Sequence, residues 1–127
     1  MISAPQPAPA ADHSDMLAAA QRMNDASERI AALSERYAAA KCVYEFESDR
    51  RKAALSAAVA PLLGGGDSAT AAEHKARASA GYGEAMRKLA LQLTAALATM
   101  SEYEAEKIRF SCAQSLCAIH RSMMTNL

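Results

Sequence analysis

The sequence has no tryptophan, two phenylalanines and four tyrosines, so it lacks the large aromatic side chains that contribute most to a globular core. Its hydrophobic fraction of 51% rests largely on 32 alanines. Alanine is the best helix former because its side chain loses no rotamer entropy in a helix. The composition predicts an all-α protein. Such small side chains also predict a self-associating homo-oligomer, because each helix leaves part of its apolar stripe uncovered.

Further absences narrow the class of protein. Three cysteines are an odd number, which argues against a disulfide framework and favours reduced thiols in a cytoplasmic protein. The net charge of zero argues against a strongly basic nucleic-acid arm. The apolar runs are short and alanine-rich, well below the ~20 residues needed to cross a bilayer. We therefore expect no membrane segment, and the proline-containing N-terminus does not match a signal peptide.

Proline and glycine divide the chain into segments. Residues 1–11 alternate proline with small residues and are expected to form a disordered tail, whereas residues 12–127 form one helical domain. Asp12 or Ser14 can cap a first helix over about residues 14–63. The glycines Gly64–Gly66 predict a turn over residues 64–69. A capping-box match at Thr70–Glu73 then predicts a second helix over about residues 70–123.

Apolar residues recur every seven residues in both predicted helices, which is typical of a coiled-coil seam. The first series runs through Tyr44 and then slips, so that the apolar positions move to Phe46, Leu55, Val59 and Leu62. The eight residues that we expect to form the hairpin or oligomer seam are Met23, Ile30, Leu33, Tyr37, Leu89, Leu93, Met100 and Tyr103.

Folding the chain about Gly65 places residue n opposite residue 130 − n and brings opposite charges together. Glu45 and Glu47 then approach Arg87 and Lys88. By the same operation, Arg22 and Arg29 approach the acids Glu102, Glu104 and Glu106. Coincidence on a charge-rich surface is the alternative. We expect a long antiparallel helical hairpin, similar to a coiled coil.

One concentration of positive charge emerges from this register. The residues that we single out for contact with nucleic acid or a protein partner are Arg50, Arg51, Lys52, Lys75 and Arg77. Cations neutralise phosphates, which dominate nucleic-acid affinity. However, consecutive residues fan around a helix, and no aromatic side chains interleave them as in single-strand binders. A solvated face is the alternative interpretation.

The remaining constellations do not predict catalysis. Cys112, Cys117 and His120 are residue types that zinc prefers, but the two thiols point about 140° apart on one helix. Gly64–Gly66 lacks the Lys-Ser/Thr ending of a phosphate loop. We therefore expect a protein that is not an enzyme and has no catalytic residue, metal or cofactor. Gly81 and Gly83 inside a helix predict a bend or a close approach of the first helix.

The residues from Tyr44 to Ser122 resemble a group of small bacteriophage helical-hairpin proteins of poorly defined function. The matching stretches are Tyr44-Glu45 leading to Arg51-Lys52-x-x-Leu55, then Ala72-Glu73-x-x-Ala76-x-Ala78-Ser79-x-x-Tyr82, and the ending His120-Arg121-Ser122. This resemblance implies phage or prophage origin near genes for recombination or single-strand annealing. The basic residues that relatives carry in the last helix are few here.

The expected function is that of a non-enzymatic phage accessory protein in the host cytoplasm. It would self-associate and bind an unidentified protein partner, with a role in DNA recombination or metabolism. A protein-directed inhibitor of a host defence complex and a purely structural coiled-coil scaffold are the alternatives.

Overall fold

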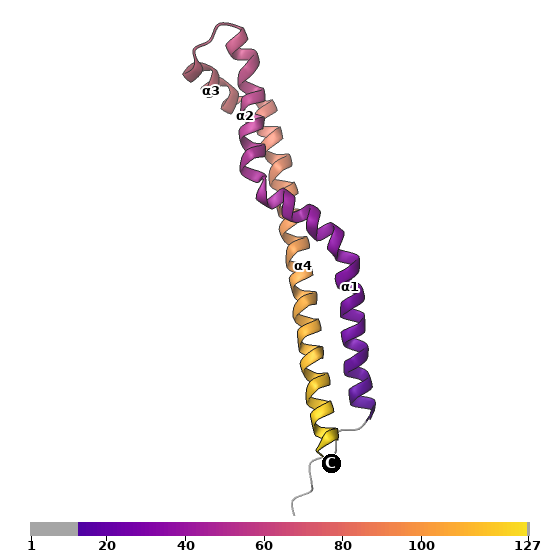
Figure 1. Ribbon diagram of the computed structural model, residues 1–127. Coiled ribbons are helices and arrows are strands. Elements are labelled where there is room, and N and C mark those ends of the chain that lie inside the picture. The colour runs from indigo at the N-terminus through magenta and orange to yellow at the C-terminus, as the bar shows by residue number, and fades with distance from the viewer. Residues whose placement is uncertain (1–12, 127) are drawn as a thin grey trace, which may run out of the picture. The chain divides into compact units, whose positions relative to one another are not determined.

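The computed structural model describes residues 13–126. This part of the chain contains four α-helices and no strand, namely α1 (His13–Glu45), α2 (Glu47–Gly64), α3 (Ala69–Ala78) and α4 (Ala80–Thr125) (Figure 1). The predicted all-α class is confirmed. The predicted tail at residues 1–11 and the cap at Asp12 lie outside the described residues. None of the described helices combines the length and hydropathy required to cross a membrane.

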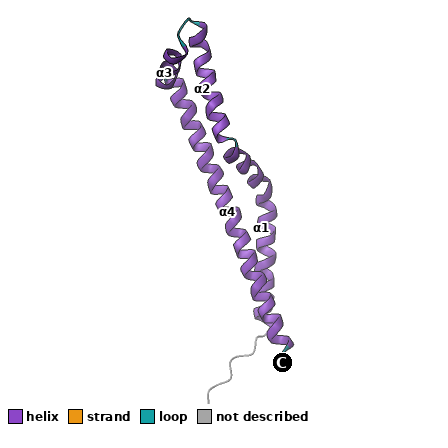
Figure 2. Cartoon of the chain, turned by 60° about the vertical axis from the view of Figure 1, so that its left-hand side comes forward, coloured by secondary structure: helices purple, strands orange, loops and turns teal. Residues whose placement is uncertain are grey.

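The chain divides into two compact units, which we describe separately. Unit 1 holds the N-terminal part of α1, up to Ala32, and the C-terminal part of α4, from Tyr103. The two segments lie side by side and antiparallel in both views (Figures 1 and 2). Their contact face is built mainly from small side chains, since the buried residues are Ala19, Ala26, Ala113 and Cys117, with Glu106.

Unit 2 comprises residues 33–102, which include the end of α1, all of α2 and α3, and the start of α4. Leu33, Ala40 and Ala96 are its buried residues on α1 and α4. On α3, Ala72 and Ala76 are buried, and this helix packs against α2. In α2, no residue is fully buried.

The first predicted helix is interrupted at Phe46, which has φ −101° and ψ 12° and separates α1 from α2. The interruption coincides with the predicted slip of the apolar stripe. Tyr44 and Phe46, both expected on the stripe, are instead 53% exposed. Val43 and Glu47 are half-buried in their place. Val43 turns inward one residue earlier than the heptad spacing predicts, whereas Glu47, seven residues after Ala40, keeps that spacing.

The glycine turn ends α2 with a hydrogen-bond pattern that glycine permits. The Asp67 N–H donates to the Leu62 carbonyl at 3.2 Å, and the Gly66 N–H donates to the Leu63 carbonyl at 3.1 Å. This pair of bonds is a Schellman motif, which requires a left-handed residue just past the helix. Gly66 supplies it with φ 97°, a conformation that costs a residue with a Cβ.

The capping box predicted at Thr70–Glu73 does not form, and another residue caps α3. Ser68, rather than Thr70, caps α3, because its Oγ accepts from the Ala71 N–H at 3.3 Å. Glu73 does not reach back to the cap but accepts two hydrogen bonds from Arg77. The helix therefore begins one residue earlier than expected, and its cap uses a single serine.

The second predicted helix is interrupted at Ser79, whose backbone is extended with φ −73° and ψ 147°. Its Oγ donates to the Ala76 carbonyl at 2.7 Å and accepts from the Tyr82 N–H at 3.3 Å. One serine therefore closes α3 and caps α4. An added Cβ at Gly81 or Gly83 would meet nothing within 4 Å, so a close approach of the first helix does not explain these glycines. The break lies two residues before Gly81.

Candidate interaction surfaces

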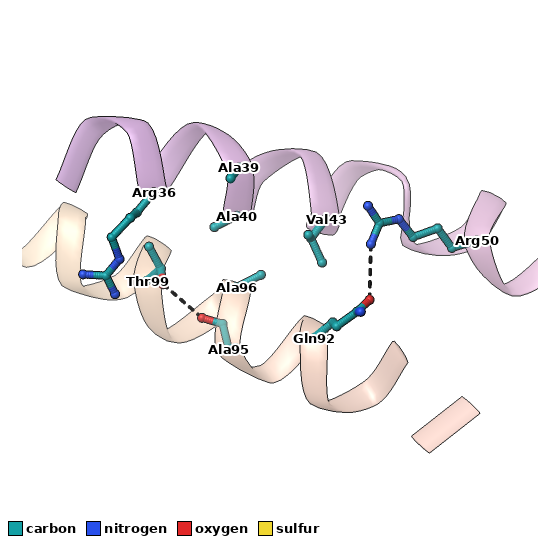
Figure 3. Close-up of a pocket in the computed structure, with 9 residues that line it drawn as sticks. All are labelled: Arg36, Ala39, Ala40, Val43, Arg50, Gln92, Ala95, Ala96 and Thr99. Carbon is teal, nitrogen blue, oxygen red and sulfur yellow. Dashed lines mark hydrogen bonds between the residues drawn. The ribbon is translucent and has the colours of Figure 1, made fainter. Parts of the chain in front are cut away.

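A groove in unit 2 runs between α4 and the segment in which α1 passes into α2 (Figure 3). It is a shallow depression, open to solvent, with a volume of about 410 Å³. Its nine lining residues, here called the alanine groove, are Arg36, Ala39, Ala40, Val43, Arg50, Gln92, Ala95, Ala96 and Thr99. Alanines stand on both sides of the groove, Ala39 and Ala40 on α1 and Ala95 and Ala96 on α4, so no large side chain fills it.

Two guanidinium groups flank this alanine groove. The Arg50 Nη1 donates to the Gln92 Oε1 at 3.3 Å, a neutral partner that leaves the arginine charge uncompensated (Figure 3). For Arg36, the structure of residues 13–126 gives no ion pair. The Thr99 hydroxyl donates to the Ala95 carbonyl at 3.1 Å. The groove therefore combines an apolar floor with two cations.

This combination is suited to a bulky apolar side chain accompanied by carboxylates. The alanine groove is open to solvent, so a large aromatic or aliphatic side chain could rest on its apolar floor with one face still exposed. Arginine pairs with carboxylates through a planar fork of donors. No nucleophile, general base or metal-ligand set lines the groove.

The five cations singled out from the sequence do not form one basic surface. Arg51 pairs with Glu47, and Arg77 pairs with Glu73 at 2.9 Å. Lys75 pairs with Asp67 at 3.1 Å. Within residues 13–126, Lys52 has no ion pair. Neighbouring acids thus compensate three of the five charges.

These cations also lie in two separate places. Arg50, Arg51 and Lys52 stand near the start of α2, whereas α3, which carries Lys75 and Arg77, lies beside the other end of α2 (Figures 1 and 2). The expectation that all five gather at one level is wrong. It assumed that residues 70–123 form a single helix, but the break at Ser79 lets α3 fold back on α2.

The charge pairings predicted by folding about Gly65 are met in part. Arg29 pairs with Glu106, one of the acids expected near it, but this pair fits residue n opposite 135 − n rather than 130 − n. Glu45 and Glu47 instead pair within their own segment, with Lys41 and Arg51. Arg87 likewise pairs with Glu84. Local partners three or four residues away on a helix are already within reach and need no long-range register.

The eight predicted seam residues are all covered to some extent. Leu33 is buried, and the other seven are half-buried: Met23, Ile30, Tyr37, Leu89, Leu93, Met100 and Tyr103.

Inside unit 1, Glu106 is a buried carboxylate in an otherwise apolar face, with 6% of its side chain exposed. The Arg29 Nε donates to its Oε2 at 2.8 Å, and the Arg109 Nη1 donates to its Oε1. The Arg29 hydrogen bond holds the pKa of Glu106 below its ordinary value, against the opposing effect of burial, and the Arg109 charge adds to the lowering. The same bond raises the pKa of Arg29.

A second apolar stripe on α4 was not identified from the sequence. It consists of five exposed residues within unit 1, here called the α4 stripe: Ile108, Cys112, Leu116, Ile119 and Met123. Their spacing of four, four, three and four residues puts them within about 80° of one another around the helix. This spacing was available as a signal, but the heptad analysis followed one stripe per helix.

The cysteines and histidine considered for zinc differ in their surroundings. Cys112 is exposed, whereas Cys117 is buried. His120 is half-buried, and its Nδ1 is buried without a hydrogen-bond partner among the described residues. Among the described residues, no three or more potential metal ligands lie together. The expectation that these residues hold no structural metal stays a prediction.

Comparison with known proteins identifies no relative, because no protein-family model, curated protein or solved structure matches the chain.

Proposed function

We propose that the chain is a non-enzymatic phage accessory protein that binds an acidic segment of a partner protein in the alanine groove and works as a homo-oligomer. The observation that carries this proposal is the pairing of an apolar, unfilled floor with two arginines that lack acidic partners, Arg36 and Arg50. Helical residues form both sides of the site, α4 on one side and the α1 and α2 segments on either side of Phe46 on the other.

The DNA-related part of the proposal has less support. A phosphate-binding surface needs cations that are free to release counterions on contact. Arg51, Lys75 and Arg77 are instead held by neighbouring carboxylates. We therefore infer that a role in DNA recombination or metabolism runs through a protein partner. An inhibitor of a host defence complex would use the same groove, and the identity of the partner separates the two functions.

The test is capture of partners from phage-infected bacteria with tagged wild-type protein, followed by mass spectrometry. Two variants address the groove: Arg36→Glu reverses one flanking charge, and Ala95→Phe fills the groove from an exposed wall position. Arg87→Glu is the matched control, because Arg87 is exposed, lies outside the groove and pairs with Glu84. A partner retained by wild type and control but lost from both groove variants supports the proposal. Equal capture by all four proteins contradicts it.

A further inference from the structure

In unit 1, α4 carries two apolar faces. The seam face, which includes Phe110, Ala113 and Cys117, is covered by α1. The α4 stripe lies about 120° around the helix from it. The exposed fractions of four of its members are 64% for Ile108, 38% for Leu116, 54% for Ile119 and 46% for Met123. No described segment of the chain covers this face, and contiguous exposed apolar patches are surfaces where partners bind.

The two edges of the α4 stripe differ in charge. One edge carries the exposed serines Ser111, Ser115 and Ser122 and no charged residue between Ile108 and Met123. The other edge carries Arg109 and borders a hollow of about 290 Å³, which Arg22 and Arg29 line from α1 and Ile108, Cys112 and Leu116 line from the stripe. Glu106 pairs with both Arg29 and Arg109, so three guanidinium groups stand at this edge against one carboxylate. The serine edge offers no charge with which an oppositely charged partner could pair. Its small, neutral side chains do allow a second copy of the helix to approach closely.

The difference between the edges also selects an orientation. When two identical helices pack antiparallel, like edges meet, so the arginines of one copy would face the arginines of the other. When they pack parallel, each arginine edge lies beside the serine edge of the partner, without apposition of like charges. Parallel packing keeps the two stripes in register.

We propose that two copies of the chain associate through the α4 stripe, with their α4 helices parallel and in register. This arrangement places Cys112 opposite Cys112 of the second copy and buries Leu116 and Ile119 between the helices. The inference deepens the self-association in the proposed function and does not depend on the alanine groove.

The first test measures the oligomeric state by sedimentation velocity at micromolar concentration. Wild type is expected to be a dimer. Leu116→Glu and Ile119→Glu are each expected to raise the dimer dissociation constant by roughly a hundredfold or more, because the interface would bury carboxylates without partners. Both residues are surface-exposed in the single chain, so helix content by circular dichroism should not change. Leu17→Glu is the control, since Leu17 is a 64% exposed leucine on α1 of the same unit.

The second test addresses the orientation with a Cys42→Ser variant, which keeps Cys112 as the exposed thiol. Diamide takes up two electrons and two protons as two thiols form a disulfide. A covalent dimer on a non-reducing gel, absent after Cys112→Ser, supports the parallel register. A wild-type monomer, or a dimer that survives Ile119→Glu, overturns the proposed interface. A dimer broken by Ile119→Glu that gives no Cys112 disulfide overturns the parallel orientation. Capture of a partner through the alanine groove would stand in each of these cases.

Discussion

Arg29 of α1 donates its Nε–H to the Oε2 of Glu106 of α4 at 2.8 Å, and so joins the two helices of unit 1 across 77 positions in the sequence. The carboxylate also accepts from Arg109 on its own helix. A buried charge is tolerated only when it is paired and hydrogen-bonded, and Glu106 meets both conditions.

Replacing this carboxylate should destabilise unit 1. Glu106→Gln leaves Arg29 and Arg109 close to each other without a compensating charge, so we expect a lower urea midpoint. The control is Glu104→Gln, because Glu104 is 54% exposed and its contact with Lys107 is 3.8 Å long. An exposed pair of this kind contributes little to stability. Equal midpoints for the two variants would show that the buried pairing is not stabilising.

The same residue predicts a dependence on acid. The pKa of Glu106 is lowered in the folded state from its ordinary value near 4.5. Its contribution to stability is therefore fully present above that value and is lost as the pH falls below it and through the lower, folded pKa. Urea unfolding between pH 7 and pH 3 should show a loss of stability that is smaller in Glu106→Gln than in wild type. An identical pH profile in the variant would contradict this role.

Ser79 should matter more than its exposed position suggests. Loss of an N-cap side chain costs about 1 kcal/mol, and Ser79→Ala removes both the cap of α4 and the bond to Ala76. We expect a lower free energy of unfolding, measured by circular dichroism in urea. Ser56→Ala, at an exposed position inside α2, should leave it unchanged or slightly higher, because alanine is the better helix former. A Ser79→Ala variant as stable as wild type would argue against the shared cap.

Two glycines should respond to alanine in opposite directions. Gly83 lies in α4 with nothing within 4 Å of an added Cβ, so Gly83→Ala should stabilise the protein by about 0.5–1 kcal/mol. Gly66 has φ 97°, so Gly66→Ala should destabilise it by about 1–2 kcal/mol. Thermal unfolding measures both effects. A stabilising Gly66→Ala would rule out the left-handed cap.

Nucleic-acid binding, if the chain has this activity, should map to the start of α2. Arg51→Ala combined with Lys52→Ala should weaken binding of labelled DNA irrespective of its sequence, and should flatten the dependence of affinity on salt. Arg87→Ala serves as the exposed control on α4. Absence of binding at low salt to both single- and double-stranded DNA would remove nucleic acid from the proposed function.

The sequence predicted the features that depend on local pattern. Alanine content predicted the helices, and the heptad spacing predicted the covered face that holds Leu33. It could not predict which side chain turns inward after Ala40. A slip is visible in the sequence, but whether Tyr44 or Val43 turns inward depends on how the neighbouring helix packs.

Ser79 shows a second limit of sequence reasoning. Serine occurs both inside helices and at their caps, and only the competing hydrogen bonds to Ala76 and Tyr82 reveal which role it has. The missed break moved Lys75 and Arg77 away from the expected basic surface. The alanine groove could not be predicted from the sequence either, because a hollow depends on which small side chains face each other across two helices.

The buried alanines have a consequence for which substitutions the fold accepts. Ala26 and Ala72 are fully buried at 0% exposure, and Ala19 and Ala76 at 1%. At such positions a larger apolar side chain forces the helices apart, which typically costs about 1–3 kcal/mol. The packing constraint at these positions is on side-chain size rather than on hydrophobicity. In a saturation library screened for folded protein, glycine and serine should therefore survive at these sites more often than leucine, the reverse of the ranking found in an ordinary hydrophobic core.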